Sequence, residues 1–376
     1  MGGRAPQCIA IAGNRVKITN IRTLKVEVPL DKPMITAIHR TETVGCLLVV
    51  IETECGLVGE NYIFALNKAR LEVFEGMIRS LSQYVIGQNA LYVERIWEHM
   101  WADINPVGQK GIAVSAISAL DTALWDLIGK RAGLPLYQLF GACRDRVHAY
   151  ASSGLWLSSS IDELVEEAQD FVRQGFRSMK LRLGKDNPAE DVARVAALRE
   201  VLGDEIEILT DANQALTPRQ AMHLARQIEK YNIGWFEEPV PAHDLVGHAR
   251  ILESINIPVA SGETDYTRFG MKTILDARAV DILMPDLQRI GGLSEFRKAA
   301  ALASAYHVPV STHIFTEQSL SIAGSTANCI SVEHVSWFTP LFRESMQIEE
   351  GNILMPEEPG LGFTFDYNFI DQHLMK

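Results

Sequence analysis

The chain lacks a long uninterrupted apolar run and has no block of basic residues. Its net charge is -12, with 35 Lys and Arg against 47 Asp and Glu. Nucleic acids and anionic membranes are bound by basic patches, so we expect neither as a partner. The apolar part of the N-terminal run MGGRAPQCIAIAGNRVKITN is too short for a signal peptide, and no other stretch is expected to reach membrane-spanning length.

Cysteines are also few. The five of them are odd in number and show no metal-type pairing. This usage is typical of a reducing compartment with buried thiols, so we expect the protein to be cytoplasmic. The five are Cys8, Cys46, Cys55, Cys143 and Cys329.

What the chain does have is length and a rhythm. With 376 residues, 47% of them hydrophobic, it can bury a large core. From about residue 147, short apolar runs alternate with polar turns and helical patterns, which indicates an α/β fold with a parallel sheet. Eight runs predict a closed barrel. They are 148–153, 178–184, 206–213, 233–239, 257–263, 280–286, 308–314 and 330–335.

The regions before and after the barrel read differently. Residues 1–145 show three strand-like runs followed by helical stretches, which indicates an α+β domain. Residues 346–376 return to strand and turn signals and are expected to fold back onto that first domain. The predicted barrel domain is therefore 146–345.

Three carboxylates end successive predicted strands, each about one βα repeat after the last: Asp211, Glu237 and Glu263. In a βα barrel such positions converge on the face where active sites lie. Any one of these acids alone would more simply cap the following helix. Three like charges together need compensation, and an all-oxygen set favours Mg²⁺.

Two cations precede the acids in the run SMKLRLG. Lys180 and Arg182 lie two residues apart and so project to the same face of their strand, toward the barrel interior. The simpler alternative is a solvated surface pair, but a strand covered by helices has little solvated surface.

The later strands end in Asp286 and His313. A carboxylate bonded to one ring nitrogen of histidine fixes the tautomer and makes the other nitrogen a better general base. A lone buried histidine would more often be structural, and the Asp one strand earlier favours catalysis. Glu317, four residues past His313, is expected at the same mouth.

Together these motifs resemble the mandelate racemase subgroup of the enolase superfamily. The resemblance rests on Lys180-x-Arg182, TDANQ, WFEEP, GET, MPDLQRIGG and STHIFTE, with GENYIFAL, ALDTALWDLIGK and PGLGF elsewhere. It implies a modified TIM barrel, (β/α)7β, closed by the N-terminal domain and completed by the tail. It also implies a homo-oligomer, up to an octamer.

The resemblance implies roles for individual residues. Asp211, Glu237 and Glu263 would hold Mg²⁺, and His313 with Asp286 would be the acid/base dyad. Lys180 would contact the substrate carboxylate, Asn213 its hydroxyl, and Glu317 the carboxylate or the developing enediolate. Cap residues set specificity in the family, which points here to His39, Arg40, Asn61, Tyr62 and Asn67, although loops are polar in any case.

One position departs from the racemase pattern, which has Lys where this chain has Arg182. Arginine is a permanent donor rather than a base, so His313 would be the one ordinary base. One base suffices to dehydrate an acid sugar to a 2-keto-3-deoxy acid. Two alternatives stay open: a racemase or epimerase of a 2-hydroxy acid that uses Arg182, and a non-catalytic metal-binding or ligand-sensing barrel.

Overall fold

The computed structural model describes residues 15–375. The predictions for the N-terminal run and for Cys8 lie largely outside these residues. An antiparallel sheet opens the chain, in the order β1-β2-β3. Its strands are β1 (Ile18–Ile35), β2 (Arg40–Thr53) and β3 (Val58–Ala65), and three helices cover it, α1 (Leu71–Leu81), α2 (Val93–Asp103) and α3 (Ile112–Ala132).

The predicted barrel is confirmed. Eight parallel strands run in chain order from β4 to β11, and β11 closes the ring by pairing with β4. They are β4 (Arg146–Ala151), β5 (Ser178–Arg182), β6 (Glu207–Asp211), β7 (Ile233–Glu237), β8 (Val259–Ser261), β9 (Ile282–Leu283), β10 (Val310–Ser311) and β11 (Cys329–His334). Each coincides with one of the eight apolar runs, so the fold class is the modified TIM barrel with an N-terminal cap.

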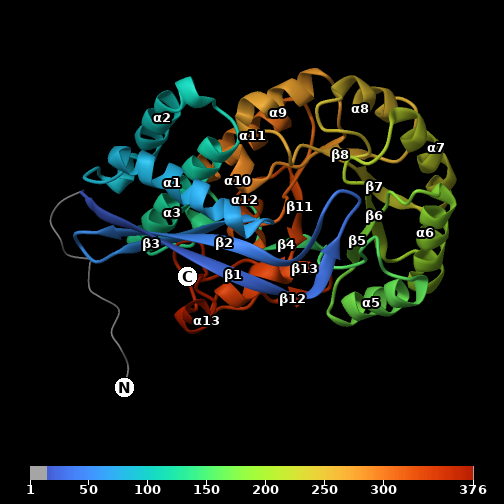
Figure 1. The fold of residues 1–376 in the computed structure, drawn as a ribbon, viewed down its shortest axis with the longest axis horizontal. Helices are drawn as coiled ribbons and strands as arrows, with labels where there is room; N and C mark the ends of the chain where they lie inside the picture. Colours follow the sequence, from blue (N-terminus) through green and yellow to red (C-terminus); the bar gives the residue numbers. More distant parts are fainter. Residues whose placement is uncertain (1–14, 376) are drawn as a thin grey trace.

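Helices form the outer layer of the barrel and follow seven of its strands, as the (β/α)7β pattern requires (Figure 1). They are α5 (Ile161–Arg173), α6 (Pro188–Leu202), α7 (Pro218–Ile228), α8 (Leu245–Leu252), α9 (Thr267–Asp276), α11 (Leu293–Ala305) and α12 (Thr316–Ser325). Local signals explain where they begin. Thr217 and Gln220 form a capping box on α7, with Pro218 in its first turn.

Because side chains alternate along each strand, every second residue points into the barrel interior. Tyr150, Leu209 and Trp235 point inward and pack with three other apolar side chains in the barrel interior. Because the strand period is two, the next inward positions along β6 and β7 are Asp211 and Glu237. An apolar layer therefore lies beneath the charged strand ends.

Hydrogen bonds join the cap to the barrel next to the barrel mouth. The side chain of Gln288, in the short helix α10 (Leu287–Ile290), accepts a hydrogen bond from the backbone N–H of Phe64 on β3 at 2.9 Å. The Ser118 hydroxyl on α3 donates to the Leu287 carbonyl at 2.7 Å. Figure 1 shows the β1–β2 hairpin reaching from the cap to the barrel mouth beside β5.

The C-terminal segment touches both parts. β13 (Asn352–Leu354) pairs antiparallel with barrel strand β4 and with β12 (Ile348–Glu349). After α13 (Tyr367–Gln372), Leu374 forms a bridge with Val26 of β1. The segment thus pairs first with the barrel and then, from Gly360 onward, also contacts the cap, where Gly360 forms a bridge with Pro135 and the Leu361 N–H donates to Asp126.

One helix corrects the expectation that no stretch reaches membrane-spanning length. Helix α3 is long and apolar enough to do so by length and composition, but 83% of its most apolar window is buried inside the protein. Its apolar surface packs against the cap sheet, α1 and α2, as in the core helix of a globular domain.

Candidate active site

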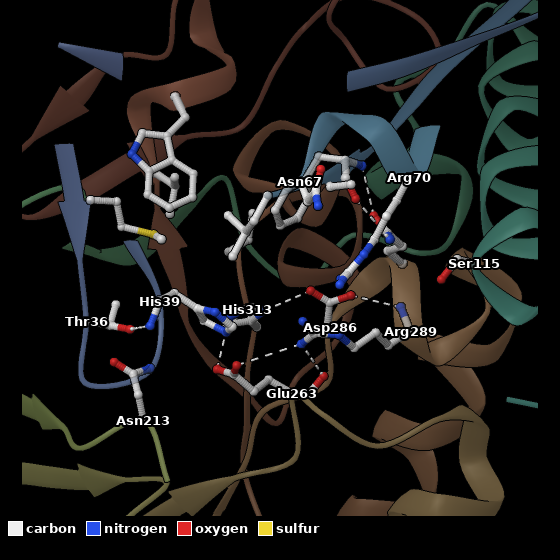
Figure 2. A pocket seen from close by; sticks show the side chains of 18 of the residues that line it. Thr36, His39, Asn67, Arg70, Ser115, Asn213, Glu263, Asp286, Arg289 and His313 are labelled. Atoms are coloured by element: carbon white, nitrogen blue, oxygen red, sulfur yellow. Dashed lines mark hydrogen bonds and ion pairs between the residues drawn. The ribbon is translucent and has the colours of Figure 1, made fainter. Parts of the chain in front are cut away.

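A cavity of about 660 Å³ lies between the cap and the strand ends of the barrel. The barrel contributes Arg182, Asn213, Glu263, Asp286, His313 and Glu333 to its wall. The cap contributes residues from the β1–β2 hairpin, from the segment after β3 and from the start of α3. Figure 2 shows the labelled side chains of both sides facing this space.

The three predicted metal ligands stand at the ends of neighbouring strands. Asp211 and Glu237 are partners in the β6–β7 register, and Glu263 follows the end of β8. Lys180 Nζ lies 3.0 Å from Glu237 Oε1 and 3.7 Å from Asp211 Oδ2, whereas Glu263 faces His313 and Arg289. As they stand, no three His, Cys, Asp or Glu side chains within residues 15–375 are gathered closely enough to hold a metal ion.

The electrostatics of these acids nevertheless fit a cation between them. Burial, together with the charges of Asp211, Glu333 and Glu263, raises the pKa of Glu237 to about 8 against the opposing charge of Lys180. The carboxylates are therefore close enough to repel one another electrostatically. Hard divalent cations prefer carboxylate oxygens, so the donor set fits a metal of this kind once the Lys180 side chain swings away.

Lys180 and Arg182 are both buried on β5, as expected for residues two positions apart whose side chains point to the same face of the strand. Arg182 pairs with Asp211 and donates to the Ser152 hydroxyl at 3.0 Å. Burial lowers the pKa of Lys180, but Glu237 and Glu333 outweigh this effect and the net pKa is raised. The pKa of Arg182 is raised in the same way, with burial opposing and Asp211 and Glu333 prevailing. Both side chains are thus held as cations.

His313 and Asp286 are in direct contact. His313 Nδ1 lies 2.7 Å from Asp286 Oδ2, and the two residues form a backbone bridge between neighbouring strand ends. Asp286 Oδ1 also accepts the backbone N–H of Arg289 and so caps α10. One carboxylate therefore serves as the helix cap and as the partner of the ring.

The other ring nitrogen of His313 is directed at the metal-ligand candidates. His313 Nε2 lies 3.0 Å from Glu263 Oε2. Burial lowers the pKa of His313, while Glu263 and Asp286 together raise it well above its usual value. The same contact lowers the pKa of Glu263. A proton is therefore held between the imidazole and these acids.

Glu333 is a site residue that the sequence interpretation missed. It lies on β11, is 1% exposed, and accepts hydrogen bonds from Lys180 Nζ (2.7 Å), the Ser152 hydroxyl (2.5 Å) and the Ile314 backbone (2.7 Å). Burial opposes ionisation, but Lys180, His313 and Arg182 lower the pKa of Glu333 to about 2. The signal was available, since the eighth strand reads CISVEH and carries one acid.

Glu317 is placed differently from its prediction. It lies on α12, is buried, and does not belong to the cavity wall. Both carboxylate oxygens are buried without a hydrogen-bond partner within residues 15–375, and burial raises the pKa of Glu317 to about 7. The acid that meets Lys180 at the mouth is Glu333 instead, because it stands on a strand and not on the helix beyond the strand end.

The predicted substrate-binding residues divide into two groups. Asn213, His39, Arg40 and Asn67 line the cavity. Asn61 and Tyr62 do not. Asn61 is buried and donates to the Ala119 carbonyl at 3.2 Å, and Tyr62 is fully buried, with its ring 4.8 Å from that of Phe338 and 5.3 Å from that of Phe315. Arg289, Arg70 and Ser152 line the cavity as well, and the sequence interpretation had not singled them out.

A capped βα barrel whose mouth joins three strand-end acids, a buried lysine and a His–Asp pair defines an enzyme of the enolase superfamily. Family models support this assignment. The model "Enolase C-terminal domain-like" matches residues 163–369, and "Mandelate racemase / muconate lactonizing enzyme, N-terminal domain" matches residues 18–141. The chain belongs to the mandelate racemase/muconate lactonizing enzyme family.

Relatives of known activity include lyases and isomerases. L-talarate/galactarate dehydratase of Salmonella typhimurium is 33% identical, over 85% of this chain and 80% of that protein. The 3,6-anhydro-alpha-L-galactonate cycloisomerase of Streptomyces coelicolor is 34% identical, over 93% and 97%. The crystal structure of L-talarate dehydratase from Polaromonas sp. JS666, complexed with Mg and L-glucarate, has a TM-score of 0.91 at 32% identity, covering 96% of this chain and 98% of that one.

Proposed function

We propose that the protein dehydrates an acid sugar, an aldonate or aldarate, to a 2-keto-3-deoxy acid with the aid of Mg²⁺. One observation carries the choice of reaction: His313 is backed by Asp286 at 2.7 Å, whereas the two cations on β5 are each tied to carboxylates. The site therefore offers one base that can both accept and return a proton.

Binding of the substrate carboxylate falls to Lys180, beside the acids that would hold a metal. Asp211, Glu237 and Glu263 would hold Mg²⁺, which when bound supplies a Lewis acid for the carboxylate oxygens. Lys180 is kept charged and is oriented by Glu333, so its ammonium group can face the same oxygens. Such fixed charges stabilise the second negative charge that develops when the α-proton leaves.

Proton transfer falls to His313. Glu263 would leave Nε2 on binding Mg²⁺, so the imidazole could then lose the proton that this carboxylate stabilises. The neutral Nε2 removes the α-proton, and the C–H electron pair moves onto the carboxylate as charge. Asp286 keeps the Nδ1 proton in place and stabilises the imidazolium. The imidazolium then returns its proton to the β-hydroxyl as the C–O bond breaks, so that water leaves, and the enol product tautomerises to the keto acid.

The racemase or epimerase alternative needs a second base opposite His313. Arg182 would have to lose a proton, yet its ion pair with Asp211 raises its pKa. The cycloisomerase relative keeps isomerase chemistry as the second candidate. The non-catalytic barrel remains the third candidate, and the intact His313–Asp286 pair counts against it.

The test is a panel of aldonic and aldaric acids incubated with the protein and Mg²⁺ in D₂O. Dehydration predicts keto acid, scored by semicarbazide absorbance, with deuterium at the carbon that lost the hydroxyl. Racemisation or epimerisation predicts deuterium at the α-carbon without keto acid. Absence of both from every acid would leave only the non-catalytic barrel.

A further inference from the structure

The two faces of the active-site cavity differ in the charged residues that they carry. The barrel face carries both signs: the acids Glu263, Asp286 and Glu333, and the basic residues Arg182, Arg289 and His313. The cap face carries no acid among the residues that line the cavity, but it does carry three basic residues: His39, Arg40 and Arg70. This local excess of positive charge occurs in a chain with a net charge of -12.

The two cap arginines that line the cavity have no partner among the described residues. Within residues 15–375, neither Arg40 nor Arg70 forms an ion pair, and neither guanidinium forms a side-chain hydrogen bond or ring contact. Two other cap cations, by contrast, have acidic partners: Lys68 pairs with Glu27 at 2.5 Å, and Lys130 pairs with Asp126 at 2.7 Å. Lys68 and Arg70 lie in the same short helical turn, η2 (Lys68–Arg70), so the difference does not come from the backbone.

The arginines are directed at the substrate space. Figure 2 shows Arg70 extending from its turn into the cavity, on the side of Asp286. Arg40 lies at the start of β2, beside the hairpin tip over the barrel mouth. The pKa of His39 is lowered, first by burial and then by the positive charges of Arg289 and Arg70, while Glu263 opposes the shift. The cap end of the cavity is therefore electropositive.

We infer that the substrate is a dicarboxylate acid sugar, an aldarate, whose second carboxylate is bound by Arg40 and Arg70. The inference rests on the proposed function, which places the reacting carboxylate at Lys180 on the barrel side. A guanidinium presents a planar fork of N–H donors that matches a carboxylate. The remote carboxylate would form ion pairs with the two arginines, as Asp211 does with Arg182 on the barrel side of the cavity.

Matched acids test the inference. Each aldarate is paired with the aldonate that differs only in having a terminal hydroxymethyl group, and kcat and KM for keto acid formation are measured with Mg²⁺. We expect the best aldarate to exceed its paired aldonate by about tenfold to a hundredfold in kcat/KM, the factor typical of a hydrogen-bonded charge pair. Calorimetric affinities for the same pairs provide a readout that does not depend on turnover.

Variants assign the effect to the arginines. Arg70→Gln and Arg40→Gln should each lower kcat/KM for the aldarate by about tenfold, mainly through KM, and change the aldonate by less than about threefold. Arg70→Lys should restore part of the loss, since it keeps the charge without the fork. Lys68→Gln is the matched control, with the same loss of charge in the same turn but outside the cavity wall, and it should leave both substrates unchanged.

Several outcomes would overturn the inference. One is equal affinity and equal kcat/KM for aldarate and aldonate, and another is an equal loss on both substrates in the arginine variants. Preference for a terminally phosphorylated aldonate over the aldarate would overturn the assignment of a carboxylate. Failure of the proposed function looks different: no acid would yield keto acid, while calorimetry would still report whether the diacid binds through Arg40 and Arg70.

Discussion

At the barrel mouth, the charged side chains that we assign to the chemistry each touch a charge of opposite sign, whereas Arg40 and Arg70 on the cap face touch none in the part of the chain that the structure describes. The mouth is buried, and a buried charge without a partner is costly, so folding itself fixes these pairs. The two arginines are exposed, and water can solvate them until a ligand arrives. The charged groups of the barrel mouth are thus paired before any ligand binds, whereas the two cap arginines are free to pair with one.

The largest effect expected at the mouth follows removal of the base. His313→Asn should lower both α-proton exchange in D₂O and keto acid formation by about 10⁴-fold, because no other group in the site is placed to accept the proton. The measurement is deuterium incorporation by mass spectrometry. His99→Asn, which changes an exposed histidine of α2, is the control and should leave both rates unchanged.

The next largest effect is expected at Glu333, one of two buried acids near the C-terminal end of the barrel; the other, Glu317, serves as its comparison. Glu333→Gln should lower kcat by about 10²-fold to 10³-fold, since Lys180 loses the acid that orients it. Glu317→Gln should change kcat by less than about threefold, because Glu317 lies outside the cavity wall. Equal losses in the two variants would show that Glu317 also acts at the reacting carboxylate.

Glu317 should instead govern stability. Burial raises its pKa from 4.5 to about 7, so between these values the folded state binds more protons than the unfolded state. Stability should therefore fall as pH rises through this window, by an amount of up to about 3 kcal/mol above pH 7. Glu317→Gln should remove this part of the pH dependence.

The measurement for Glu317 is urea unfolding at pH 5 and pH 8. The wild type should lose more stability between the two values than the variant does. Parallel losses would show that the pKa of this carboxyl is not raised in the folded protein.

The smallest effect expected at the mouth is that of Arg182→Lys. The change keeps the charge beside Asp211 but loses the fork that also donates to Ser152, so keto acid formation should fall by about tenfold or less. Chiral chromatography of the recovered acid checks for inversion. Inversion by the wild type that persists or rises in the variant, where Lys restores the racemase pattern, would instead favour the racemase alternative.

How far the sequence predicts the site depends on whether a residue lies on a strand. Asp211 and Glu237 were found because parallel strands end at one face and alternate side chains point inward. Glu333 obeys the same rule, but it lies inside the run CISVEH and not at an evident strand end, so the sequence alone does not single it out. Residue spacing alone does not show where the helix after a strand directs its side chains, and Glu317 lies on such a helix, α12.

Tyr62 illustrates a second limit. It lies on β3, where both faces of the strand are largely buried, so alternation gives no sign of which side chains face the substrate. The partnerless state of Arg40 and Arg70 was equally hidden, because only the fold shows which acids come near them. The order of the strands was predictable, whereas contacts between cap and barrel were not.

The most direct test of the central claim is crystallography with Mn²⁺ as an anomalous stand-in for Mg²⁺. We predict one strong anomalous peak at the barrel mouth, about 2.1 Å from carboxylate oxygens of Asp211, Glu237 and Glu263, with Lys180 moved away from Glu237. Absence of a peak there, or a peak bound by other residues, would contradict the account.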